Sequence, residues 1–121
     1  MLAAHQNAAV FSIHNGDHAL VRRIRYRDIR VEHYWNKLVD IRILRSRYSK
    51  DPEPGRIEDI LFERIRCIPN HFNTPSLIGG FDADHRVKNV VFRDFRIGGE
   101  PVRSADELQL YTNRADDISF E

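Results

Sequence analysis

Two short segments that combine Asp and His are the part of this chain that could support catalysis. Asp17-His18 follows an Asn-Gly pair, and Asp82, Asp84 and His85 lie in a second polar segment further along. A carboxylate beside an imidazole can act as a general acid and base, or can hold a metal ion. Asp and Asn also form polar turns, because they bond their own backbone. Both interpretations stay open. The catalytic candidates are Asp17, His18, Asp82, Asp84 and His85.

A repeated segment of thirteen residues must position these groups. Its copies begin at Val21, Ile57 and Val87, and a partial fourth copy begins at Ala115. Apolar residues alternate within each copy, as in strands with one buried face, but steps of three interrupt the alternation. We expect a corner between two short strands at each such step. Further strands are expected before the copies, at 9–14, 38–43, 76–81 and 108–113.

The spacing of the copies, 28–36 residues, is typical of an array of stacked units. No segment has the apolar spacing of a long helix, although Ser104 could cap one helical turn ending at Leu108. The sequence therefore predicts an all-β parallel β-helix, a solenoid of about four coils with the last incomplete. We expect an N-terminal segment or cap at 1–7 and one domain at 8–121, with coils at about 8–37, 38–75, 76–107 and 108–121.

Equivalent positions of neighbouring copies should lie about 4.8 Å apart, so each position becomes a column. One inner column is aromatic, and Cys67 takes an inner position as a small core residue. Three outer columns alternate in charge, which favours this register because opposite charges on adjacent strands attract. The aromatic column is Tyr26, Phe62, Phe92 and Phe120; the charged columns are Arg27, Glu63, Arg93 and Glu121, then Arg22, Glu58, Lys88 and Asp116, then Asp28, Arg64 and Asp94.

One outer column, Arg30, Arg66 and Arg96, carries a single sign of charge. Stacked guanidinium groups repel unless an anion lies among them, so the column could bind an anionic polysaccharide such as a polyuronate. Alternatively, Asp28, Glu32 and Asp94 neutralise it. Trp35 could stack on a sugar ring or cover an exposed end of the stack of coils.

Composition and charge exclude several classes of function. The chain has 121 residues and a net charge of +1, so no strong overall field favours nucleic acid. No apolar run is long enough for a membrane span, and we expect no membrane partner. The sequence has no cofactor motif, and we expect no cofactor and no metal. The start lacks the pattern of a secretory signal, which predicts a cytoplasmic protein if Met1 is the native start.

The segment Val87-Lys-Asn-Val-Val-Phe-Arg-Asp-Phe-Arg-Ile-Gly-Gly99 resembles the coils of pectin-lyase-like proteins. It is similar in particular to the C-terminal coils of glycoside hydrolase family 28-like proteins, the polygalacturonases and their relatives. This resemblance implies a right-handed β-helix and an origin among polysaccharide-active, often secreted or periplasmic, proteins. Asn15-Gly-Asp17 has the form of the first catalytic element of that family, but Gly-His-Gly is missing and Asp116-Asp117 falls out of order. No catalytic residue carries over.

Two functions from different classes follow. The first is a non-catalytic module that self-associates into a homo-oligomer through its coil ends or sides, with anionic polysaccharide as a candidate ligand along the arginine column. The second is a carbohydrate-active enzyme, a hydrolase or lyase, with a site at the Asp-His turns that could be shared between subunits. Solenoids need caps at their ends, and uncovered strand edges pair with other chains.

Overall fold

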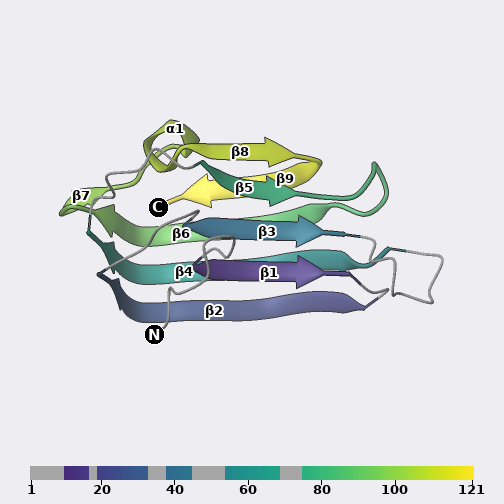
Figure 1. Ribbon diagram of the computed structural model, residues 1–121, viewed down its shortest axis with the longest axis horizontal. Helices are drawn as coiled ribbons and strands as arrows, with labels where there is room; N and C mark the ends of the chain where they lie inside the picture. The colour runs from purple at the N-terminus through teal and green to yellow at the C-terminus, as the bar shows by residue number, and fades with distance from the viewer. Residues whose placement is uncertain (1–9, 17–18, 33–37, 45–53, 69–74) are drawn as a thin grey trace.

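The computed structural model describes residues 10–16, 19–32, 38–44, 54–68 and 75–121 (Figure 1). These residues form two parallel sheets, and successive strands of the chain alternate between them. The first sheet contains β1 (Phe11–Asn15), β3 (Val39–Ile43), β5 (Ser76–Gly79) and β8 (Leu110–Asn113). The second contains β2 (Leu20–Val31), β4 (Arg56–Cys67), β6 (Val87–Ile97) and β9 (Ala115–Phe120), with β7 (Glu100–Pro101) antiparallel to β6.

The expected right-handed parallel β-helix solenoid of about four coils is wrong. The described strands form two flat parallel sheets instead. The predicted corner within each copy is also wrong, because β2, β4 and β6 each run through their copy as a single strand of 11 or 12 residues. The steps of three have a different cause, which lies in the backbone.

A residue with positive φ lies at each step of three in these strands and in β9. Left-handed backbone inserts one extra residue, after which the next side chain returns to the buried face, as in a β-bulge. A strand can therefore keep its apolar face inward without turning a corner. The residues are Arg23, Asp28, Asp59, Arg64, Asn89, Asp94 and Asp117, with φ between 53° and 59°.

The predicted register of the columns is confirmed. Tyr26 lies opposite Phe62, Phe62 opposite Phe92, and Phe92 opposite Phe120. The rings of each successive pair are stacked, with centroids 4.9–5.0 Å apart. Cys67 is buried at its inner position, and burial raises the pKa of its thiol to about 12.

The connection from β6 to β8 departs from the repeat. Gly98 and Gly99, both with positive φ, turn the chain into β7, and a short helix α1 (Ala105–Leu108) follows. Ser104 caps this helix as predicted, since its hydroxyl accepts a hydrogen bond from the Glu107 amide at 3.4 Å. The proposed N-terminal segment at 1–7 lies outside the described residues.

Candidate functional site

The second Asp-His segment forms a tight turn between β5 and β6. The Asp82 carboxylate accepts hydrogen bonds from the backbone amides of Asp84 and His85, at 3.0 and 2.9 Å. The same oxygen, Oδ1, lies 2.7 Å from His85 Nδ1. This bond lowers the pKa of Asp82, with a smaller contribution from the two amides. Asp82 thus bonds its own backbone, as in the turn interpretation of this segment.

Gly80 fixes the start of this turn. A Cβ atom there would lie 2.5 Å from the Arg114 carbonyl oxygen and 2.8 Å from the His85 carbonyl oxygen. Both contacts are to backbone atoms, which cannot move aside, so any larger residue would displace the turn. Gly80 therefore allows the turn to pack closely against the chain that leads from β8 to β9.

The other half of the predicted catalytic site, Asp17 and His18, lies outside the described residues, as does Trp35. In the part of the chain that the structure describes, no group of three or more His, Cys, Asp or Glu side chains could hold a metal ion. The carbohydrate-active enzyme stays a prediction.

The arginine column is aligned as predicted, with Arg30 opposite Arg66 and Arg66 opposite Arg96. Asp94 lies between two of these arginines and accepts 2.9 Å bonds from Arg66 Nη2 and Arg96 Nε. These bonds, first from Arg96 and then from Arg66, lower the pKa of Asp94. Arg30 pairs with Glu32 at 3.1 Å. Each guanidinium group thus has a carboxylate partner in Glu32 or Asp94, as the alternative interpretation expected, whereas Asp28 binds Arg64 instead. Anion binding stays a prediction.

A polar cluster that the sequence did not predict lies on β1 and β3. Asp40 is 1% exposed and receives the Arg42 guanidinium at 2.7 and 2.9 Å and His14 Nε2 at 3.0 Å. Burial raises the pKa of Asp40, but the bonds from Arg42 and His14 outweigh it, and the net shift is downward. The only signal in the sequence is one carboxylate among the apolar residues of this strand.

Ser12 lies 3.3 Å from the same His14 nitrogen, so Ser, His and Asp meet at one place. A catalytic triad needs the carboxylate on one imidazole nitrogen and the hydroxyl on the other. Here Nε2 faces both Asp40 and Ser12. The cluster therefore positions β1 against β3 and lacks the geometry of a nucleophilic site.

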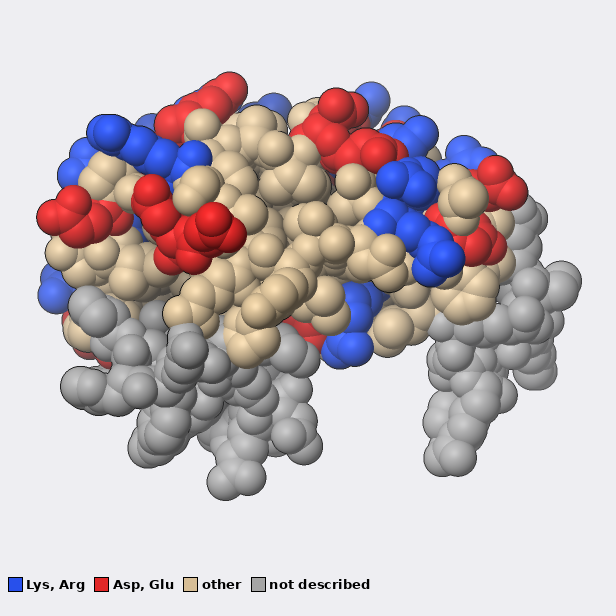
Figure 2. Space-filling view, turned by 90° about the horizontal axis from the view of Figure 1, so that it is seen from above, with Lys and Arg blue, Asp and Glu red and all other residues tan. Residues whose placement is uncertain are grey.

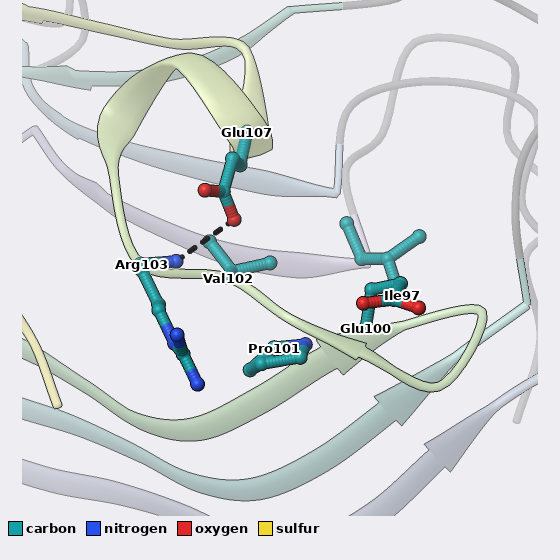
Figure 3. A pocket seen from close by; sticks show the side chains of 6 residues that line it. All are labelled: Ile97, Glu100, Pro101, Val102, Arg103 and Glu107. Atoms are coloured by element: carbon teal, nitrogen blue, oxygen red, sulfur yellow. Dashed lines mark hydrogen bonds between the residues drawn. The ribbon is translucent and has the colours of Figure 1, made fainter.

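An open hollow of about 560 Å³ lies beside the start of α1. Figure 3 shows that Glu107 points toward the Arg103 amide, which donates a hydrogen bond of 3.0 Å to Glu107 Oε2, while the Arg103 side chain points away. Glu107 thus binds the backbone that leads into the helix. None of the predicted site residues line the hollow, whose walls are Ile97, Glu100, Pro101, Val102, Arg103 and Glu107.

The columns of the second sheet end at its outer strands, β2 and β9. Phe62 and Phe92 are fully buried and each stacks on two rings, whereas Tyr26 and Phe120 are partly exposed and each stacks on one. No strand among the described residues pairs with the outer edge of β2 or β9. Each outer strand therefore presents unpaired backbone groups beside a half-covered apolar face.

The charges on these two edges differ. Four exposed arginines of β2 precede its single acidic residue, Asp28, and we call the outer edge along them the basic edge; they are Arg22, Arg23, Arg25 and Arg27. The outer edge of β9, continued by Glu121, presents Asp116, Asp117 and Glu121, and we call it the acidic edge. Figure 2 looks down on the molecule from above Figure 1, where β8 lies; acidic and basic side chains surround a central area of uncharged ones.

Comparisons with family models, curated proteins and solved structures found no match to this chain. Within the described residues, no helix is long and apolar enough to cross a membrane. The candidate functional site is therefore defined by geometry alone, as the basic and acidic edges.

Proposed function

We propose that this chain is a non-catalytic module that associates with copies of itself through its open strand edges. The observation that carries the proposal is the difference in burial between inner and outer strands of one repeat. The same aromatic column is fully buried at Phe62 and Phe92 and partly exposed at Tyr26 and Phe120. Adding another strand would remove this apolar surface from water and satisfy the edge amides and carbonyls.

The internal charge pairs also support a structural role. The arginine column and Asp82 use their hydrogen-bonding capacity on groups of the same chain. Arg64 and Asp28 do so as well, with Arg64 Nη2 donating to Asp28 Oδ2 at 3.0 Å. These side chains align strands and turns, and within the described part of the chain the outer edges of β2 and β9 have no strand paired with them.

Sedimentation velocity of the 121-residue chain over a range of concentrations tests the proposal. We expect the weight-average sedimentation coefficient to rise with concentration, because association follows mass action. A single boundary of monomeric mass up to concentrations on the order of tens of micromolar would contradict it.

A further inference from the structure

We propose that copies of this chain join head to tail, the acidic edge of one copy pairing with the basic edge of the next. This inference rests on the proposed self-association and specifies its direction and register. β9 of one copy lies parallel to β2 of the next, with Ala115 opposite Val21 and Phe120 opposite Tyr26. The contact repeats the pairing that already joins β6 to β9 within the chain.

The apolar residues of the two edges match in this register. β6 and β9 pair with Val87 opposite Ala115, Val90 opposite Ile118 and Phe92 opposite Phe120. β2 and β4 pair at the same columns, with Val21, Ile24 and Tyr26 opposite Ile57, Ile60 and Phe62. Placing β2 of a second copy on β9 therefore continues each column by one residue of its own kind. Phe120 and Tyr26 would each gain the second stacked ring that Phe62 and Phe92 have.

The charged column through Glu63 shows what the new contact would complete. Glu63 binds arginines from both neighbouring strands, Arg27 at 3.0 Å and Arg93 at 3.5 Å. Glu121, in the same column, binds only Arg93, at 2.8 Å, among the described residues. In the head-to-tail register, Arg27 of the next copy lies beside Glu121. Glu121 would then bind arginines of both neighbouring strands, as Glu63 does.

Two further columns place opposite charges across the contact. Arg22 of one copy meets Asp116 of the other, and Arg23 meets Asp117. Asp116 is already bound by Arg86 of its own chain, at 2.6 and 2.9 Å. Arg22 and Arg23 have no ion pair within the described part of their own chain. Arg23 and Asp117 both have positive φ, at 58° and 56°, so their backbones also match.

The same charges disfavour the other ways of joining two edges. Two basic edges would place arginine side chains near one another, and two acidic edges would do the same with carboxylates, both of which are repulsive on adjacent strands. Only the basic-to-acidic pairing continues the alternation. Such a contact is heterologous, so it leaves one free edge of each kind and allows further copies to add.

The first sheet can continue in the same step. Within this sheet β1 pairs with β3, β3 with β5 and β5 with β8. Continuing the same register into the next copy places Leu110 of one copy beside Phe11 of the next. Tyr111, 65% exposed on β8, would then lie against Ser12. β7 pairs with β6 at Arg96 and Ile97, beyond the part of β6 that pairs with β9. The contact with the next copy therefore involves only the part of β2 that ends near Arg27.

The head-to-tail direction can be tested by reversing the charges of the basic edge, of the acidic edge, or of both. The basic-edge variant is Arg22→Glu with Arg23→Asp, and the acidic-edge variant is Asp116→Lys with Asp117→Arg. Each new residue type already occurs in the same column of another copy. The basic-edge variant nevertheless places the new carboxylate of Arg22→Glu opposite Glu58. The acidic-edge variant places the new ammonium group of Asp116→Lys opposite Lys88 and removes the ion pair of Asp116 with Arg86, so the fold of each variant must be verified. Either variant alone should weaken association about tenfold or more, because like charges then meet. The variant with all four substitutions should associate again, because opposite charges meet in the reversed sense.

Sedimentation velocity measures all three variants, with circular dichroism to verify the fold and Arg56→Glu on the inner strand β4 as the control. Loss of association in both single-edge variants, with recovery in the combined variant, is the expected result. If the acidic-edge variant associates as strongly as wild type, the head-to-tail direction is overturned, but self-association is not. Loss without recovery in a folded combined variant would also overturn the direction. If the combined variant does not fold, the two single-edge variants are mixed instead. If one single-edge variant does not fold, the other is mixed with wild type. Either mixture must yield mixed complexes. A monomeric wild type would instead refute the proposed function itself.

Discussion

The inner strands β4 and β6 and the outer strands β2 and β9 carry the same pattern of residues but differ in environment. Phe62 and Phe92 are buried between two stacked rings, while Tyr26 and Phe120 each stack on one ring among the described residues. Glu63 binds arginines of both neighbouring strands, Arg27 and Arg93, whereas among the described residues Glu121 binds Arg93 alone. A side chain in a repeat is therefore stabilised by its neighbouring copies, and the same residue contributes less at the edge than inside.

Truncating the aromatic column should show this difference most strongly. We expect Phe62→Ala to lower the free energy of unfolding by about 3–5 kcal/mol, because it leaves a cavity between two stacked rings. Phe120→Ala removes a partly exposed ring and should cost about 1–2 kcal/mol. Urea unfolding of dilute protein, where association is weak, measures both values. Phe120→Ala should also reduce association, whereas equal losses of stability would contradict the contrast between inner and outer strands.

The first sheet allows a second comparison, between Asp40 on inner strand β3 and His14 on outer strand β1. Asp40 is 1% exposed, and His14 is 37% exposed. Asp40→Asn should cost about 1–3 kcal/mol near neutral pH, because Arg42 loses a charged partner. His14→Gln should cost less, since its imidazole is closer to solvent.

The effect of Asp40→Asn should depend on pH. The pKa of Asp40 is lowered from 3.8 in the folded protein, so the folded state binds its proton less readily than the unfolded state does. Stability from this carboxylate is therefore present above about pH 4 and declines as the pH falls through the lowered pKa. Thermal unfolding of wild type and Asp40→Asn should converge in acid. A difference that stays constant down to pH 2 would indicate that the ionised carboxylate is not what stabilises β3.

The sequence predicted the register of the strands but not their arrangement into sheets. Register follows from the columns, because sliding one strand by one residue along its neighbour would break the aromatic column and separate the opposite charges. A step of three between apolar residues is ambiguous, since either a corner or a residue with positive φ produces it. Asp and Asn at Asp28, Asp59 and Asn89 were a usable signal, because these types tolerate left-handed backbone.

The candidate site was predictable to different degrees. The turn at Asp82 was one of two interpretations of its polar segment, and the geometry agrees with that one. The cluster around Asp40 joins His14 and Arg42 through the pairing of β1 with β3. It could not be predicted from the sequence, because residues distant in sequence meet only after the two strands align.

Disulfide cross-linking between the two open edges is the most direct test of head-to-tail pairing. Arg25 and Ser119 occupy the same outer column on β2 and β9, so a head-to-tail contact should bring their Cα atoms to about 4.8 Å, within the range for a disulfide. The native Cys67 is buried, and burial raises the pKa of its thiol, so it should not interfere. After mild oxidation, Arg25→Cys with Ser119→Cys should give a ladder of covalent oligomers on a non-reducing gel. Arg25→Cys with Thr112→Cys, which places the second thiol on the other sheet, should give far less. Monomer alone, or equal cross-linking in both proteins, would contradict the pairing of the acidic edge with the basic edge.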